Sequence, residues 1–282
     1  MASREAKGPF PVEKPAVPGP SSGDVWRVPL AVWRARRALD RGELERAREL
    51  VSPLLGRFGS ITFIRKLAAE ILYASADPLS AAMLFEQAAK KLPRDHAIAV
   101  GLVASYAALN RAGDARRASA RLPDDVDVRL ALAWAELVAT GGDPQSGARI
   151  VRDTAGDPEL ARSPERGAMH RALAAIVAAR NGHADLVRAT LREAEAFRER
   201  LGAADRAFVG YLGGVALREA GLTDDARATF VVAMDASPGS IGAALARRER
   251  ANLDLRAVDS VHGAHDWHFA CRVRYRANRL FR

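Results

Sequence analysis

Cysteine, lysine and bulky aromatic residues are all scarce in this sequence of 282 residues. The single cysteine, Cys271, excludes an internal disulfide and favours a reducing compartment. Aromatic residues make up only 6% of the chain, and alanine supplies much of its apolar content, so closely packed helices are favoured over sheets. Long apolar runs are missing as well, because the longest uncharged one, residues 97–110, is too short to span a bilayer.

The first 24 residues have no apolar core of signal-peptide length and contain five prolines, at positions 9, 11, 15, 18 and 20. Such a polar, proline-rich segment cannot offset the entropy lost on ordering, so we expect residues 1–24 to be disordered. Together with the lone cysteine, this composition predicts a cytoplasmic protein.

The net charge of +9 is unevenly distributed. Only five of the 43 basic residues are lysines, and residues 240–282 hold nine arginines against four acidic residues. The rest of the chain is nearly balanced, so the basic character lies mainly at the C-terminal end.

Small and aromatic residues recur at a fixed spacing. Ala81, Phe85, Ala88 and Pro93 form the clearest unit, and the same types return at Ala226, Phe230, Ala233 and Pro238. Sliding this frame by 34 residues places Ala47 and Ala115 in register with Ala81. The second half of the unit resembles the tetratricopeptide repeat, whereas Ala68 and Ala69 stand where that family favours a Leu-Gly pair.

Four weaker copies complete the pattern, so the resemblance covers residues 25–239 as about six degenerate repeats. Their matching residues are Gly42, Ala47, Val51 and Leu54; Leu102, Tyr106 and Ala115; Trp134, Ala135, Val138, Gly147 and Val151; and Gly182, Val187, Leu191 and Ala194. The resemblance implies an all-α fold, a right-handed α-solenoid of stacked antiparallel helix pairs. An ordinary alanine-rich helical bundle is the alternative.

Each recurring residue type has a physical reason. Alanines at 47, 81, 115 and 226 let paired helices approach closely, and Phe85 and Phe230 are expected to fill the space between successive hairpins. Asp77-Pro78, Asp143-Pro144 and Ser163-Pro164 read as an N-cap followed by proline in the first turn. The turns between paired helices are expected at glycines 42, 113, 182 and 221, and Gly213 and Gly214 fall at a close-packed position.

The two ends lie outside the repeats. Ser240 is expected to cap a further helix over residues 240–258, which covers the last apolar face of the solenoid. Residues 259–282 form a basic tail rich in His and Arg. Within it, Phe269, Cys271, Val273 and Tyr275 alternate with arginines, a strand-like pattern that can fold over the groove, add to a partner's sheet, lie on an anionic surface or remain a disordered basic tail.

Motifs for chemistry are absent from the sequence. It contains no phosphate-binding glycine loop, nucleophile elbow or paired-histidine metalloprotease motif, so we expect no enzyme activity and no cofactor. His262, His265, His268 and Cys271 recur every three residues, but on a helix they fan over about 180 degrees, and a zinc site is not predicted. His96, His170 and His183 stand alone.

The family resemblance implies that the first helices of successive repeats line a concave groove that binds an extended peptide or a partner helix. The groove residues expected on this basis are Trp33, Arg36, Lys66, Glu70, Tyr73, Arg129, Glu136, Arg180, Tyr211 and Arg218. Basic groups outnumber acidic ones in this set, which favours an acidic peptide. One subfamily clamps a C-terminal carboxylate, but Glu70 would repel that group, so no clamp is predicted.

The sequence therefore favours a protein–protein interaction scaffold or adaptor, with the tail as a second contact. The alternative is binding of nucleic acid or an anionic surface through the tail. The tail residues expected to make either contact are Arg272, Arg274, Tyr275, Arg276, Arg279 and Arg282.

Overall fold

The computed structural model describes residues 28–121 and 125–261, and all regular structure in these two ranges is helical. The all-α expectation is confirmed. The expected disordered segment 1–24, and the tail beyond residue 261, lie outside the described residues.

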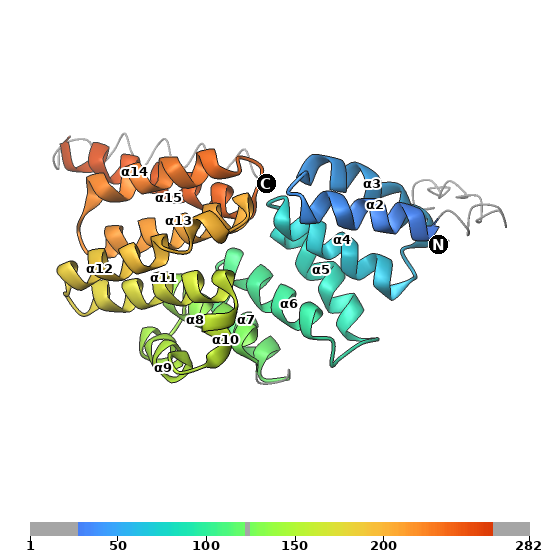
Figure 1. The fold of residues 1–282 in the computed structure, drawn as a ribbon, viewed down its shortest axis with the longest axis horizontal. Coiled ribbons are helices and arrows are strands. Elements are labelled where there is room, and N and C mark those ends of the chain that lie inside the picture. Colours follow the sequence, from blue (N-terminus) through green and yellow to red (C-terminus); the bar gives the residue numbers. More distant parts are fainter. Residues whose placement is uncertain (1–27, 122–124, 262–282) are drawn as a thin grey trace, which may run out of the picture.

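Helices adjacent in the chain pack as pairs (Figure 1). The pairs are α2 (Val28–Asp40) with α3 (Leu44–Phe58), α4 (Thr62–Ala74) with α5 (Pro78–Ala89), α6 (His96–Ala108) with α7 (Ala112–Ser119), α8 (Val126–Val138) with α9 (Pro144–Thr154), α11 (Pro164–Arg180) with α12 (Ala184–Glu195), and α13 (Ala203–Glu219) with α14 (Thr223–Ala236). The short α10 (Pro158–Arg162) precedes α11, the 3₁₀ turn η1 (Arg198–Arg200) follows α12, and α15 (Ile241–Val261) is last. These six pairs coincide with the six units of the sequence frame.

The helix starts follow from local sequence. Asp77 accepts a hydrogen bond from the Ser80 amide at 3.1 Å, and Asp143 accepts one from the Gln145 amide at 3.0 Å. Each caps a helix that begins with proline. Proline is tolerated at this position because an N–H in the first turn of a helix has no acceptor within the helix. Ser163 caps α11 in the same way, so all three expected caps are confirmed.

The turns agree with the glycine pattern at three of four positions. Gly42, Gly182 and Gly221 have φ of +73°, +79° and +77°, a left-handed conformation that costs glycine little. The expectation for Gly113 is wrong, because this residue lies inside α7 and Asn110, with φ of 60°, makes the turn instead. Asparagine tolerates this conformation better than most residues.

The core is built from the expected small and aromatic residues. Alanines 47, 81, 115 and 226 are all fully buried, and so is Phe230. The Phe85 ring packs directly on Gly101 of α6, where a Cβ would lie only 2.3 Å from the ring. Phe85 therefore fills the space before the next hairpin, as expected. The Phe230 ring instead meets Gly214 of α13, inside its own hairpin.

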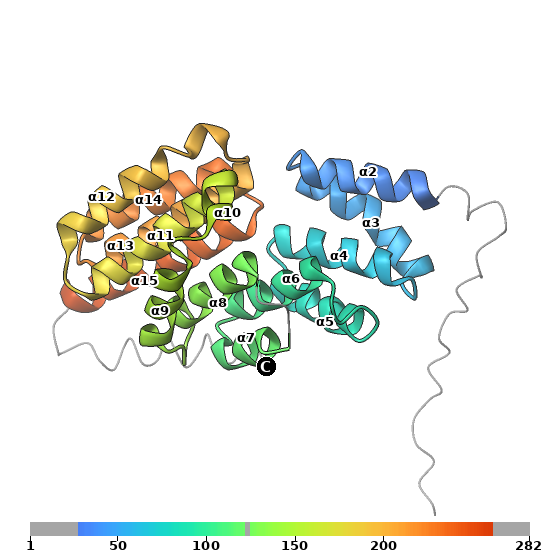
Figure 2. The ribbon, with the colours of Figure 1, turned by 60° about the horizontal axis from the view of Figure 1, so that its bottom comes forward.

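The chain curves so that distant helices meet. Figure 2 shows α6 and α8 between the first four helices and the group from α11 to α15. The Ser240 hydroxyl caps the start of α15, and Arg248 of α15 reaches the backbone carbonyl of Ala108 at the end of α6, with 3.4 Å between nitrogen and oxygen. This contact spans 140 residues of sequence and brings the last helix against the third pair.

Candidate functional site

An aromatic cluster lies where α8 and α13 face each other. The ring of Trp134 stands edge-on to that of Phe208, with centroids 4.8 Å apart, and Tyr211 lies 6.5 Å from Trp134. Trp134 and Tyr211 are buried, and burial raises the pKa of the Tyr211 hydroxyl to about 12. Tyr73 on α4 lines the same cavity as Trp134 and Phe208, and burial and the neighbouring Tyr211 raise the pKa of its hydroxyl above its usual range.

Beside the aromatic cluster is a cavity of about 270 Å³, named here the inner pocket. Five helices, α4, α6, α8, α11 and α13, contribute its walls. Its apolar lining residues are Tyr73, Val100, Ala104, Leu130, Ala131, Trp134, Met169, Phe208 and Val209. Its polar lining residues are Asp127, Glu165, Arg166 and Asp205. This combination of apolar walls and a few charged groups is typical of a binding pocket.

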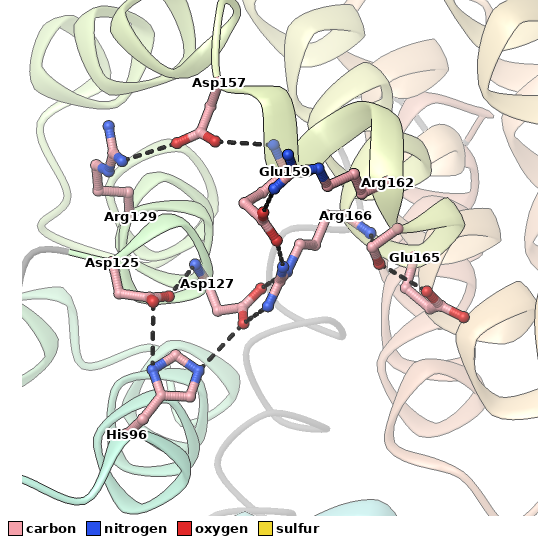
Figure 3. A network of polar contacts seen from close by, with 10 residues as sticks. His96, Asp125, Asp127, Arg129, Asp157, Glu159, Arg162, Glu165 and Arg166 are labelled. Atoms are coloured by element: carbon pink, nitrogen blue, oxygen red, sulfur yellow. Dashed lines mark hydrogen bonds and ion pairs between the residues drawn. The ribbon is translucent and has the colours of Figure 1, made fainter.

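Arg166 organises the polar side of the inner pocket (Figure 3). Its guanidinium donates to both carboxylate oxygens of Asp127, at 2.7 and 2.8 Å, and to Glu159 at 2.6 Å. These bonds favour the charged guanidinium and raise the pKa of Arg166 above its ordinary value. The network joins α8, α10 and α11 and fixes their relative positions at the rim.

Two other carboxylates at the rim are not engaged by a cation. Glu165 accepts a hydrogen bond from the Ser163 hydroxyl at 2.7 Å, and neither Glu165 nor Asp205 forms an ion pair within the described part of the chain. The pKa of Asp205 is raised above its ordinary value, mainly because its carboxyl is desolvated and secondly because the charge of Glu165 is near. The residue as a whole is nevertheless exposed. The inner pocket therefore presents negative charge beside an apolar wall.

His96 meets two carboxylates at the edge of this network, which the sequence did not indicate. Its Nδ1 lies 3.5 Å from Asp125 and its Nε2 lies 3.2 Å from Asp127, a set of side chains that metals can use. Each member already has another role, however. Asp125 caps α8, both oxygens of Asp127 accept from Arg166, and the two ring nitrogens face different carboxylates. The set therefore reads as a structural link between α6 and α8.

The five basic residues expected in the groove all contact acidic residues. Lys66 pairs with Asp95 at 2.8 Å, Arg129 with Asp157 at 3.0 Å, and Arg180 with Glu219 at 3.5 Å. Arg36 pairs with Glu70, and Arg218 pairs with Glu249 of α15. Arg36 and Glu70 are 34 residues apart, one step of the sequence frame, so this ion pair links α2 to α4, the first helices of two successive pairs.

The other expected groove residues lie in different environments. Trp33 on α2 is 52% exposed, with the Arg37 guanidinium 5.0 Å from its ring centroid. Tyr73 lines the inner pocket, whereas Tyr211 and Glu136 are buried and cannot contact a partner as surface residues. The chain curves tightly enough for α4, α8 and α13 to enclose the two tyrosines.

Glu136 forms an ionic contact with Arg116 instead, in which the glutamate is buried and the arginine is half exposed. Its two oxygens accept from Nε and Nη2 of Arg116, each at 2.7 Å, and one also accepts from the Asp143 amide at 2.7 Å. These contacts bind α8 to α7 and to the start of α9.

Replacing Glu136 with alanine is expected to lower the free energy of unfolding by about 2–4 kcal/mol, because three charge-assisted hydrogen bonds are lost in a buried site. Urea denaturation followed by circular dichroism measures the change. Glu193→Ala is the control, since that residue pairs with Arg171 at 3.1 Å but is exposed, and its loss is expected to cost about 0–1 kcal/mol. Equal effects of the two substitutions would contradict the buried role of Glu136.

The expected contacts of the tail, Arg272, Arg274, Tyr275, Arg276, Arg279 and Arg282, lie outside the described residues, as do His262, His265, His268 and Cys271.

Comparisons with protein-family models, with curated proteins and with solved structures found no match. None of the helices in the described ranges combines the length and apolar character needed to cross a bilayer. The described ranges form an all-helical protein of adjacent helix pairs with a pocket between α4, α6, α8, α11 and α13.

Proposed function

We propose that this protein is a non-enzymatic interaction scaffold, a right-handed solenoid of tetratricopeptide type that binds a segment of a partner protein at the inner pocket. The observation that carries the proposal is the pocket itself, about 270 Å³ with aromatic walls and a charged rim. Six helix pairs in register with the sequence frame and the Arg36–Glu70 pair support the family assignment.

The chemistry of the rim favours a particular kind of segment. An acidic partner was expected from an excess of basic groove residues, but those residues already have acidic neighbours. The groups left for a partner at the pocket are the carboxylates of Glu165 and Asp205. We therefore propose a segment with one large apolar side chain for the pocket and a lysine or arginine next to it.

Defined peptides test this proposal. We expect a fluorescein-labelled 12-residue peptide with a central Lys-Phe-Lys to bind the full chain in fluorescence anisotropy, and the matching Glu-Phe-Glu peptide to bind at least tenfold more weakly. We expect Glu165→Lys to weaken binding of the Lys-Phe-Lys peptide at least tenfold, because it puts a cation where the peptide's own cation must lie.

Glu49→Lys is the matched control, since Glu49 is an exposed carboxylate on α3 and the substitution changes net charge equally. The proposal fails if the two peptides bind alike, or if both lysine variants weaken binding to the same extent.

The remaining parts of the functional assignment are also proposals. The single cysteine supports a cytoplasmic location. The arginines beyond residue 261 support a second contact, either with the partner or with an anionic surface such as nucleic acid.

A further inference from the structure

A second cavity lies across α13 from the inner pocket. It has a volume of about 470 Å³ and is named here the α12–α14 cleft, because these two helices form its walls. Val209 of α13 lines both cavities, whereas Phe208 lines only the inner pocket and Gly210 and Gly213 line only the cleft. Occupation of one cavity therefore leaves the other accessible.

Two glycines of α13 line the floor of the cleft. Gly210 and Gly213 lie on the α13 surface between the walls, where a Cβ would stand 3.0 Å from Ala233 and 3.4 Å from Leu191 respectively. In addition, α12 packs closely on α11 and only lightly on α13, so the wall formed by α12 stands away from the floor. The exposed wall is apolar, and Val232 of α14 keeps half of its surface in solvent.

The charges around the cleft are mainly basic. Arg188, Arg192, Arg198 and Arg206 line it together with one acidic residue, Glu195. Arg188 pairs with Asp225 at 3.2 Å and Arg198 pairs with Glu195, while one nitrogen of Arg206 donates to the Leu201 carbonyl.

The side chain of Arg192 makes no hydrogen bond or ion pair within the described ranges. Two more carboxylates, Glu199 of η1 and Asp235 of α14, line an adjoining pocket that shares Arg198, Arg206 and Val232 with the cleft.

The length of the cleft indicates a helical ligand. Its floor runs along α13 from Arg206 to Leu217, about 16 Å at the helical rise, or three turns. A helix with apolar residues at i, i+4 and i+7 presents an apolar stripe about 10 Å long, which fits within this floor.

We propose that the α12–α14 cleft binds an amphipathic helix of a partner protein, with its apolar stripe against Gly210, Gly213 and Val232 and acidic residues on its flanks facing the arginines. Charge complementarity decides between this occupant and a basic helix. Four arginines line the cleft, and Arg192 is available to a carboxylate of the partner.

A designed peptide tests the charge requirement. The probe is a 15-residue alanine-based helix with leucines at i, i+4 and i+7 and glutamates flanking the stripe, compared with the same peptide carrying lysines. Fluorescence anisotropy with the full chain is expected to give at least tenfold tighter binding of the glutamate peptide. Arg192→Glu is expected to weaken that binding at least fivefold, and Arg149→Glu, an exposed arginine on α9, is the control of equal charge change.

The apolar contact has its own test. Val232→Glu is expected to reduce affinity at least tenfold, whereas Leu255→Glu, at an exposed leucine of α15, leaves it unchanged. Both sites are at least half exposed, so each variant is expected to fold, and circular dichroism verifies this. The proposal is overturned if the lysine peptide binds as tightly as the glutamate peptide, if neither binds, or if the cleft variants behave like their controls.

Discussion

Replacing Phe230 with alanine is expected to lower the free energy of unfolding by about 3–5 kcal/mol. The ring is fully buried and sits directly on Gly214, so its removal leaves a cavity between α13 and α14 that neither helix can close by a small movement. Phe85→Ala is expected to have a similar effect at the junction of α5 and α6. Urea denaturation of each variant, followed by circular dichroism, measures the loss.

Phe63→Ala is the control for these two variants. This phenylalanine lies in the first turn of α4 and is 59% exposed, so the same chemical change is expected to alter stability by no more than about 0.5 kcal/mol. A cost at Phe230 no larger than that at Phe63 would show that Phe230 does not occupy the packed position between α13 and α14.

The substitution Trp134→Ala tests whether the chain closes on itself. In an open groove, a tryptophan on the inner surface is accessible and its loss costs little. Here Trp134 is buried against Phe208 and Tyr211, so we expect a loss of about 3–5 kcal/mol, which includes about 0.5–1.5 kcal/mol for the edge-on contact with Phe208.

Trp33→Ala is the matched control for this second prediction. Trp33 is 52% exposed on α2, with the guanidinium of Arg37 over its ring, so its loss is expected to cost less than about 1 kcal/mol. If Trp134→Ala is as mild as Trp33→Ala, α8 and α13 do not close on each other in solution. The intrinsic fluorescence of the parent chain, with and without acrylamide, gives an independent measure of tryptophan burial.

The sequence predicted those features that depend on neighbouring residues. The caps at Asp77, Asp143 and Ser163 are local, because each side chain bonds to an amide two or three positions ahead. The buried alanines and phenylalanines followed from the spacing of the frame. Gly113 shows the limit of this reasoning. This glycine was expected to make the turn, but Asn110, three residues earlier, adopts the left-handed conformation instead.

The candidate site was predicted only in part. Tyr73 was expected in the partner-binding groove, and the structure places it in the lining of the inner pocket. The contact between His96 and Asp127 joins residues 31 apart, and no local pattern marks it. The α12–α14 cleft was missed because Gly213 and Gly214 were read as one close-packed position, although Gly214 packs under Phe230 and Gly213 faces the cleft.

The sequence by itself determined where the helices start, which faces they bury and that they pair along the chain, because these properties depend on contacts within about 34 residues. Only the tertiary structure decided the curvature. Small differences in how each pair packs on the next accumulate over six pairs, and their sum brings Trp134 against Phe208 and Arg248 against Ala108. That accumulated rotation encloses the expected groove residue Tyr211 and leaves the inner pocket beside it, with the α12–α14 cleft on the other side of α13.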